Sequence, residues 1–133
     1  MLKMKNFPSK YVFNINPVPA SRPRLSRYGA FFTGPYKKFR TEATPIILNV
    51  IGNEIIFPLD HLIVTIELCV VRPKKTVLLY PRADVDNYAK SILDLMNGKL
   101  CKDDQQVVML EVSKQWSTYD VGYFTVQVSP VLS

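Results

Sequence analysis

The sequence has very few residues that bind soft metals. It contains one histidine, His61, and two cysteines, Cys69 and Cys101, which form no metal-spaced motif. These residues cannot build a zinc site from nitrogen and sulfur ligands, so a bound metal would need oxygen ligands. The single histidine also argues against chemistry that uses a His–metal pair or a histidine general base. The two thiols need no special role in an intracellular protein.

Long hydrophobic runs and glycine-rich phosphate loops are also missing. No apolar run approaches the roughly 20 residues needed to span a membrane. The first residues, MLKMKNFPSKYVF, lack the apolar stretch of a secretory signal. The five glycines are scattered, and the motif GxxxxGK(S/T) does not occur. We therefore expect a cytoplasmic protein with no membrane partner, folded as a single domain over residues 1–133.

Acidic residues are absent from the first 41 positions, and the whole chain has a formal net charge of +6. This region carries nine cations: Lys3, Lys5, Lys10, Arg22, Arg24, Arg27, Lys37, Lys38 and Arg40. Aromatic residues interleave with them, including Tyr28, Phe31, Phe32, Tyr36 and Phe39. Cations beside aromatic rings suit contact with phosphates and stacking on bases. The alternative is a solvated basic surface with the rings in the core, which we favour for the rings but not for the cations.

The order of the expected elements indicates a mixed α/β (α+β) fold, with a small mixed sheet of about four strands and two main helices. Strands are expected at 11–15, 29–33, 62–71, 107–116 and 121–128, and helices at 35–53 and 86–97. Residues 20–28 are expected to form a polar loop, and Pro45 to interrupt or bound the first helix. The last two strands are expected to pair as a hairpin.

The helix at 86–97 is the best-defined element, because its polar and apolar residues separate at 100° per residue. The polar side holds Asp86, Asn87, Lys90, Ser91, Asp94 and Asn97, and the apolar side holds Tyr88, Ala89, Ile92, Leu93, Leu95 and Met96. Gly98 stands where the residue after the C-cap is expected.

Five of the eleven acidic residues lie within 21 positions: Asp84, Asp86, Asp94, Asp103 and Asp104. Carboxylates gathered in a basic protein repel one another less when a cation binds between them, and Mg²⁺ prefers such oxygen ligands. At the start of a strand only one of two neighbours points to a given face, so we expect one ligand and one bystander in Asp103-Asp104. A basic protein with a Mg²⁺-like site suggests metal-assisted chemistry on a polyanion, most commonly nucleic acid.

Some of these residues also have a purely structural interpretation. Asp86 can cap the helix N-terminus, although this leaves Asp84 unexplained. Asp86, Lys90 and Asp94 can form a surface ion ladder at i, i+4 and i+8. For Lys90 we favour a functional role, since an amine one turn from a metal-binding carboxylate can reach the scissile phosphate or the attacking water.

Residues 82–108, RADVDNYAKSILDLMNGKLCKDDQQVV, resemble the RusA-type Holliday junction resolvases, whose core reads D-x-D-N-x-x-K, D-A-L and then D-D-x-Q-V. The matching positions are Asp84, Asp86, Asn87, Lys90, Asp94, Asp103, Asp104, Gln106 and Val107. The basic segment 17–24 resembles the opening of phage and prophage members. The resemblance implies that Asp84, Asp86 and Asp104 bind Mg²⁺, or Mn²⁺ in its place, with Lys90 as the essential amine. It also implies a homodimer that cuts two opposed strands of a four-way junction.

Two departures from the family pattern limit what the resemblance implies. Ala83 stands where the family has arginine before the first aspartate, and Arg82 lies one position earlier. Cys101 and Lys102 replace the aromatic residue that often precedes the second aspartate pair. The resemblance therefore supports metal-dependent cleavage more strongly than it supports a preference for a particular DNA sequence at the cut site.

Our leading hypothesis is a Mg²⁺-dependent, structure-selective endonuclease that resolves four-way DNA junctions in recombination and repair. The expected catalytic residues are Asp84, Asp86, Asp104 and Lys90, supported by Asp94, Asp103 and Asn87. The expected DNA-binding residues are Arg22, Arg24, Lys37, Lys38, Lys74, Lys75 and Arg82. Two alternatives stay open: a non-catalytic nucleic-acid-binding protein, and a Mg²⁺-dependent nuclease acting on other branched DNA or on RNA. The number of metal ions, the cut-site preference and the dimer surface are not determined by the sequence.

Overall fold

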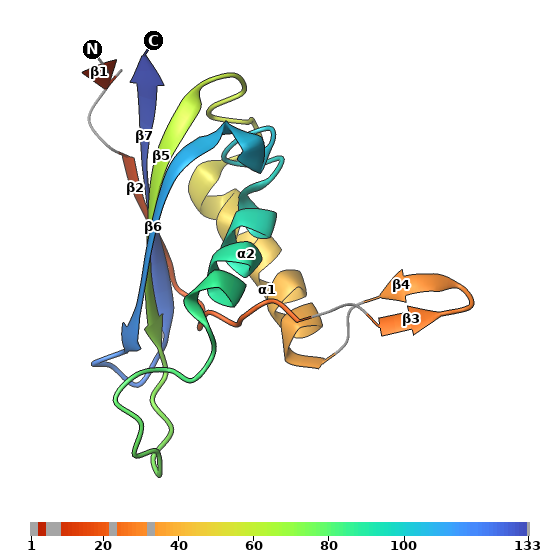
Figure 1. The fold of residues 1–133 in the computed structure, drawn as a ribbon, viewed down its shortest axis with the longest axis vertical. Helices are drawn as coiled ribbons and strands as arrows, with labels where there is room; N and C mark the ends of the chain where they lie inside the picture. The colour runs from red at the N-terminus through yellow and green to blue at the C-terminus, as the bar shows by residue number, and fades with distance from the viewer. Residues whose placement is uncertain (1–2, 5–8, 22–23, 32–33, 133) are drawn as a thin grey trace.

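The computed structural model describes residues 3–4, 9–21, 24–31 and 34–132, and these form an α+β fold as predicted (Figure 1). The strands are β1 (Lys3–Met4), β2 (Ser9–Phe13), β3 (Arg24–Ser26), β4 (Gly29–Phe31), β5 (His61–Val70), β6 (Val107–Trp116) and β7 (Tyr123–Leu132). The helices are α1 (Gly34–Ile51), α2 (Val85–Met96) and the short 3₁₀ helix η1 (Asp104–Gln106). Both α-helices cover the same face of the main sheet (Figure 1).

The main sheet is mixed, with the order β1-β7-β5-β6, and β2 also pairs with β7. β5 is parallel to β6 and antiparallel to β7. Parallel neighbours need a crossover connection, and α2 with η1 provides it. The predicted hairpin between the last two strands is therefore wrong, because β5 lies between β6 and β7. The connection 117–122 passes the end of β5, where Ser117 N donates a 2.7 Å hydrogen bond to Val70 O.

The hydrophobic core lies between the helices and the covered face of the sheet. Alternate residues of β5 point into it, since side chains along a strand alternate between faces. Leu62, Val64, Ile66 and Leu68 are all essentially buried. The other large, fully buried residues come from β2, both helices, β7 and the turn after α2: Phe13, Tyr36, Ile47, Ile92, Met96, Leu100, Phe124 and Val126. The sheet thus provides a rigid base for α2, which carries most of the predicted site.

Two local predictions from the sequence need correction. α1 continues through Pro45 to Ile51, so this proline does not bound the helix. Pro45 is exposed, and a proline there removes one helical hydrogen bond without disturbing the buried side of the helix. The expected loop at 20–28 contains β3, which pairs with β4 in a separate two-stranded sheet. The segment has too few apolar residues to show a strand pattern, although Gly29 gives it a turn.

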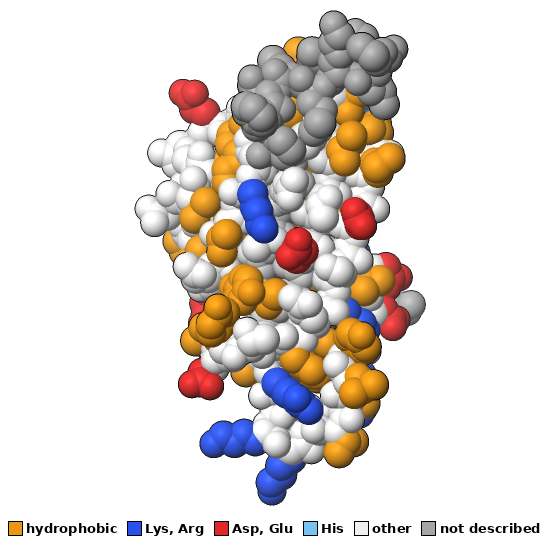
Figure 2. Space-filling view, turned by 90° about the vertical axis from the view of Figure 1, so that its left-hand side faces the viewer, with side chains coloured by type: hydrophobic (Ala, Val, Ile, Leu, Met, Phe, Trp, Pro, Cys, Tyr) orange, Lys and Arg blue, Asp and Glu red, His pale blue; other side chains and the backbone are white. Residues whose placement is uncertain are grey.

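The face of the main sheet away from the helices is shown in Figure 2. Apolar and uncharged polar side chains are mixed on it, and lysine and arginine side chains gather at its lower end, where the loop between β5 and α2 projects. Within the part of the chain that the structure describes, no helix has the length and hydropathy to cross a membrane.

Candidate active site

α2 carries the centre of the candidate site, and its apolar side is held in the core as the periodicity predicted. Tyr88, Ala89, Ile92, Leu95 and Met96 are buried. Gly98 has a positive φ of 78° directly after the C-cap Asn97, also as predicted.

The polar side of α2 is narrower than the sequence predicted. Ser91 is fully buried, and its hydroxyl and Asn97 Oδ1 have no hydrogen-bond partner among the described residues. Asn87 stays exposed, and Asp86, Lys90 and Asp94 form a row at i, i+4 and i+8 on the helix. These three side chains line the pocket described next.

A pocket of about 490 Å³ lies between this row and β6. Its charged lining consists of Asp86, Lys90, Asp94 and Asp104, and its apolar lining consists of Val85, Ala89, Leu93, Leu110 and Val112. Asp104 comes from η1 and the other three charged residues from α2. The structure therefore brings together two of the three predicted metal ligands, the predicted amine and one predicted supporting residue.

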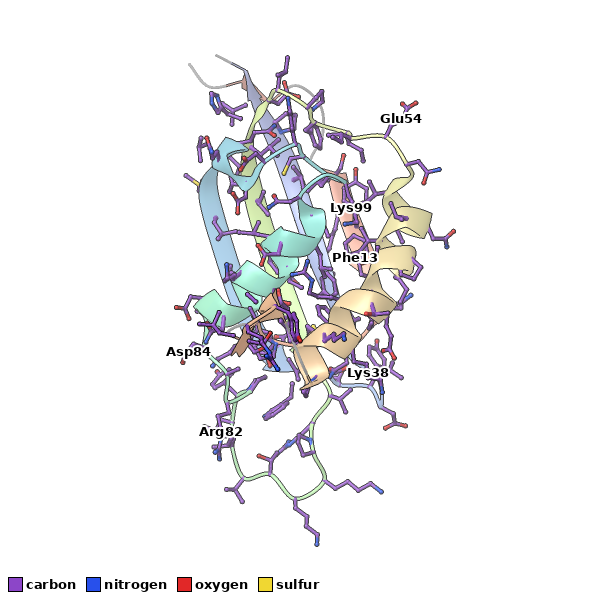
Figure 3. All side chains as sticks on the ribbon, turned by 90° about the vertical axis from the view of Figure 1, so that its right-hand side faces the viewer. Phe13, Lys38, Glu54, Arg82, Asp84 and Lys99 are labelled. Atoms are coloured by element: carbon purple, nitrogen blue, oxygen red, sulfur yellow. The ribbon has the colours of Figure 1, made fainter. Side chains whose placement is uncertain are left out.

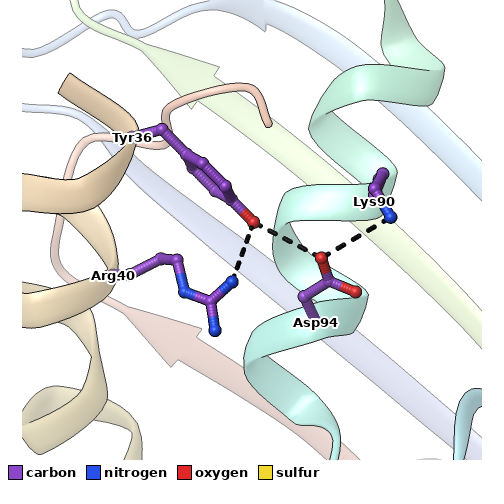
Figure 4. A network of polar contacts seen from close by, with 4 residues as sticks. All are labelled: Tyr36, Arg40, Lys90 and Asp94. Atoms are coloured by element: carbon purple, nitrogen blue, oxygen red, sulfur yellow. Dashed lines mark hydrogen bonds and ion pairs between the residues drawn. The ribbon is translucent and has the colours of Figure 1, made fainter. Parts of the chain in front are cut away.

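Lys90 and Asp94 form an ion pair inside a wider polar network (Figure 4). Lys90 Nζ lies 3.8 Å from Asp94 Oδ2, and the same oxygen accepts a 3.4 Å hydrogen bond from the hydroxyl of Tyr36. Arg40 donates to that hydroxyl at 3.4 Å and lies over the Tyr36 ring, 5.6 Å from its centroid. The ion ladder considered for α2 thus includes the Lys90–Asp94 pair, and Asp94 also links α2 to α1.

Burial of its phenol raises the pKa of Tyr36, and the negative charge of Asp94 raises it further, while Arg40 lowers it. The phenol is therefore held in its protonated form, in which it can donate to Asp94. Tyr36 acts here as a fixed hydrogen-bond donor to a carboxylate at the edge of the pocket.

Asp103 and Asp104 have different roles, in line with the expectation that only one of them faces the site. Asp103 is the N-cap of η1, and its Oδ1 accepts a 3.0 Å hydrogen bond from Gln105 N. Gln106 completes this capping box by accepting hydrogen bonds from the backbone of Lys102 and Asp103 at 2.9 and 3.0 Å. Asp103 is thus committed to the turn, whereas Asp104 lines the pocket.

The pKa of Asp104 is raised. Although the residue as a whole is exposed, partial loss of solvent around its carboxyl group is the largest cause, followed by a hydrogen bond with Asp103 and the negative charges of Asp103 and Asp94. Lys90 acts in the opposite direction. The carboxylate form of Asp104 therefore has an excess of negative neighbours, and a cation in the pocket would relieve that repulsion.

Asp84 lies outside the lining of the pocket. It is the N-cap of α2 and is exposed, and its side chain makes no capping hydrogen bond. The loop that leads to it is tied to β6, since Lys114 Nζ donates a 2.7 Å hydrogen bond to Ala83 O and Trp116 Nε1 donates a 3.0 Å bond to Leu78 O. Asp86, and not Asp84, extends from the first turn of α2 into the pocket, so the N-cap interpretation of Asp86 is wrong.

The donor chemistry of this pocket fits a hard divalent cation, but the spacing of its carboxylates limits how many can bind one ion. At a rise of about 1.5 Å per residue, Asp86 and Asp94 are about 12 Å apart along the helix axis. Among the described residues, no group of three or more acidic, histidine or cysteine side chains is arranged to hold a metal. Mg²⁺ usually takes one or two carboxylates and completes its shell with water and substrate phosphates, so a pocket with two accessible carboxylates suits it.

The predicted DNA-binding residues gather at one end of the molecule, as far as the structure describes them. Figure 3 shows Lys38, Arg82 and Asp84 at the end where both α-helices begin. The exposed members are Lys37 and Lys38 of α1 and Lys74, Lys75 and Arg82 of the loop before α2. Lys38 also pairs with Glu42 at 3.9 Å. Arg22 lies outside the described residues, and Arg24 is placed in β3 without a described side chain.

Sequence reasoning missed the residues that support this site from other elements. Tyr36 and Arg40 were counted only as members of a basic, aromatic segment, although their i, i+4 spacing on a helix indicates that they can meet. Val112, Lys114 and Trp116 are spaced by two residues and therefore lie on the same face of β6. The sequence shows this shared face, but it does not show that Lys114 and Trp116 donate hydrogen bonds to the loop before α2.

A basic α+β protein whose pocket combines carboxylates with one lysine is typical of enzymes that act on the phosphodiesters of nucleic acids. The family model of the endodeoxyribonuclease RusA matches residues 14–127, which include α1, β5, α2, β6 and part of β7. The chain therefore belongs to the RusA endodeoxyribonuclease family, a family of DNA-cleaving enzymes, and the resemblance drawn from residues 82–108 is confirmed.

A curated protein also shares part of this sequence. The uncharacterized protein YqaN of Bacillus subtilis (strain 168) is 53% identical over 36 residues. The matched segment covers 27% of this chain and 25% of YqaN, so the similarity spans about a quarter of that relative's length. This relative is uncharacterized by name, so the functional proposal rests on the family and on the pocket.

Proposed function

We propose that this protein is a divalent-metal-dependent endonuclease that cuts branched DNA, four-way junctions above all, during recombination and repair in the cytoplasm. The observation that carries the proposal is the position of Lys90 in a pocket with Asp86, Asp94 and Asp104, in a chain of the RusA family. An amine among carboxylates can act on a phosphate only if the negative charge of the pocket is offset, which a bound cation does.

Asp86 and Asp104 would hold Mg²⁺ or Mn²⁺ from the two sides of the pocket. Asp84, the third ligand expected from the sequence, lies outside the pocket lining and is not assigned to the ion. When bound, the ion supplies Lewis acidity, which lowers the pKa of a bound water and neutralises charge on the phosphate. The pocket also has an apolar lining from Leu93, Leu110 and Val112. The charged side chains of Asp86, Lys90 and Asp104 remain exposed to solvent.

Lys90 would stabilise the charge that develops on the scissile phosphate or orient the attacking water. Its partner Asp94 holds the amine over the pocket, and the hydroxyl of Tyr36 holds Asp94. Asn87 follows Asp86 in the first turn of α2, where its backbone carbonyl accepts a 2.9 Å hydrogen bond from Ala20 N. Asp103 supports the site indirectly, because it caps the turn that carries Asp104.

The basic end of the molecule would position the substrate. The side chains of α1 and of the loop before α2 that can contact phosphates without reading sequence are exposed: Lys37, Lys38, Lys74, Lys75 and Arg82. A four-way junction has two opposed strands to cut, and a C2 homodimer would present two pockets of matching symmetry. We therefore propose a homodimer as the working form.

The test is a cleavage assay with four-way junction, flap, duplex and RNA substrates, each with and without Mg²⁺. Wild-type protein is expected to cut the junction only with Mg²⁺. The variant Asp86→Asn is expected to bind the junction but not to cut it, because the amide keeps the shape of the carboxylate and removes its charge. Mn²⁺ is expected to substitute for Mg²⁺.

Ser91→Ala is the matched control, since Ser91 lies on the same helix but is buried away from the pocket lining. It is expected to cut like the wild type. A wild type that binds every substrate and cuts none would favour the non-catalytic alternative. If flap DNA or RNA is cut in preference to the junction, the proposed substrate is wrong. If Asp86→Asn cuts as fast as the wild type, the proposed active site is wrong.

A further inference from the structure

A small hairpin stands away from the body of the molecule, beyond the start of α1 (Figure 1). Its strands β3 and β4 pair antiparallel as far as Ser26 opposite Gly29, and Arg27 and Tyr28 form the turn between them. The hydroxyl of Ser26 accepts a 3.1 Å hydrogen bond from Tyr28 N and donates a 3.3 Å bond to Gly29 O. Gly29 has a φ of 117°, which an L side chain rarely adopts. The turn is thus held by local bonds.

The tip of this hairpin exposes large side chains that the fold does not use. Leu25 is 84% exposed and Tyr28 is 88% exposed. The guanidinium carbon of Arg27 lies 5.4 Å from the centroid of the Tyr28 ring. An isolated two-stranded hairpin is only marginally stable, and these side chains add little packing to it. An aromatic ring beside an arginine is, however, a suitable platform for stacking on a nucleobase.

The chain segment that leads into the hairpin is tied to the helix that carries the candidate active site. The chain enters it after Ala20, whose backbone N–H donates a 2.9 Å hydrogen bond to Asn87 O in the first turn of α2. Asn87 directly follows Asp86, which lines the pocket. The chain leaves the hairpin towards α1, whose first turns carry the exposed Lys37 and Lys38. DNA held over the pocket would therefore pass beside the hairpin.

We propose that the β3–β4 hairpin is a DNA-contacting arm whose Tyr28 ring stacks on an unstacked base at the branch point of the substrate. The proposal rests on the proposed function for its choice of branched DNA. Charge favours DNA over a second copy of the chain, because no acidic residue precedes Glu42 and the tip carries Arg27. Two identical basic arms repel each other, whereas phosphates attract them.

The experiment measures binding of a four-way junction that carries the fluorescent base 2-aminopurine next to its branch point, in EDTA so that no cleavage occurs. Wild-type protein is expected to quench the base by stacking. Tyr28→Ala is expected to bind the junction about tenfold more weakly, as the loss of one aromatic stacking contact predicts, and to leave the fluorescence unchanged. Tyr28→Phe keeps the ring and is expected to restore both signals to within about twofold of wild type.

Tyr119→Ala is the control, because Tyr119 is another exposed tyrosine, on the connection between β6 and β7. It should bind and quench like the wild type. The proposal is overturned if Tyr28→Ala binds and quenches like the wild type. It is also overturned if sedimentation shows that Tyr28→Ala is a monomer where the wild type is a dimer, because the arm would then contact a second copy of the chain. If the wild type quenches the fluorescent base but never cuts DNA with Mg²⁺, the proposed nuclease activity is refuted, while the proposed DNA contact of the hairpin stands.

Discussion

Tyr36 and Asp94 lie 58 residues apart in the chain and are joined by a 3.4 Å hydrogen bond from the tyrosine hydroxyl to Asp94 Oδ2. The same carboxylate pairs with Lys90 at 3.8 Å. One side chain of α1 thereby fixes the partner of the proposed catalytic amine on α2. Asp94 thus connects the proposed catalytic lysine on α2 to a side chain of α1.

Tyr36→Phe is predicted to reduce the cleavage rate about threefold, as expected for one long hydrogen bond between uncharged donor and carboxylate. The phenyl ring keeps the core packing of Tyr36, so the melting temperature should change little. Steady-state kinetics should show a lower kcat with an unchanged KM, because the bond positions Lys90 and does not touch DNA. Phe39→Leu, a change in the same helix that alters packing alone, is the comparison. A kcat for Tyr36→Phe equal to wild type would show that Asp94 needs no support from α1.

Lys90→Ala is predicted to lower kcat about 100-fold or more, the usual cost of removing a donor that stabilises transition-state charge. Junction affinity in EDTA should change less than threefold, since Lys90 is one of many cations near the substrate. Single-turnover rates and equilibrium binding separate the two effects. Ser91→Ala should cut normally and melt slightly higher, because it removes a buried hydroxyl with no partner among the described residues. Equal losses of binding and rate in Lys90→Ala would make Lys90 a phosphate contact only.

Asp104→Asn is predicted to raise the melting temperature at pH 7 while abolishing cleavage. The raised pKa of Asp104 means that the folded state holds this proton more tightly than the unfolded chain, whose carboxyl titrates near the ordinary value of 3.8. The contribution of Asp104 to stability is therefore present below pH 3.8 and is lost as pH rises through the raised pKa. The neutral amide avoids this loss, so the advantage of the variant should shrink as pH falls towards 4.

Thermal melts of both proteins between pH 4 and pH 8 check this prediction. Adding Mg²⁺ should raise the melting temperature of the wild type and leave Asp104→Asn nearly unchanged, because a ligand stabilises only the form that binds it. A lower melting temperature for the variant at pH 7 would mean that the carboxylate of Asp104 stabilises the fold, and the repulsion inferred in the pocket would be wrong.

The sequence predicted the elements whose signal is local. α2 was recognisable because a 12-residue amphipathic pattern is followed by a glycine, Gly98, and β5 because it is a mostly apolar, β-branched run. Strand pairing was not predictable in the same way. β6 and β7 are consecutive and separated by a short turn, which favours a hairpin. In the structure, however, β5 lies between them and pairs with β6 on one edge and with β7 on the other. That choice depends on burial across the whole sheet.

The site was predictable to the extent that its residues share one motif. Asp86 and Lys90 are one helical turn apart, so their proximity follows from α2 alone. Asp84 precedes the helix, and its direction depends on the loop that Lys114 and Trp116 tie to β6. Tyr36 contacts Asp94 from another helix, and a contact between residues 58 positions apart cannot be predicted from local spacing in the sequence. Tertiary packing determines these positions.

Gln106→Ala is predicted to destabilise the protein by about 2 kcal/mol, because several backbone groups lose their partner at once. The side-chain amide donates to the carbonyls of Phe57 and Asp60 at 2.8 and 2.9 Å and accepts from two backbone N–H groups of the turn before η1. It therefore joins the turn that carries Asp104 to the segment before β5. Urea unfolding measures the loss of stability, and cleavage at a temperature where the variant is folded should fall as well, since Asp104 is no longer held against the pocket.

Gln105→Ala is the matched control for that variant. Gln105 is exposed, and its backbone N–H, which alanine keeps, donates the hydrogen bond to Asp103 in the turn. Its stability should stay within about 0.5 kcal/mol of wild type, with normal cleavage. Gln106→Glu removes the donor half, because a carboxylate still accepts from the turn but cannot donate to the two carbonyls, and it also adds a negative charge near Asp103 and Asp104. If Gln106→Glu were as stable and active as wild type, the link between this turn and the segment before β5 would not position Asp104.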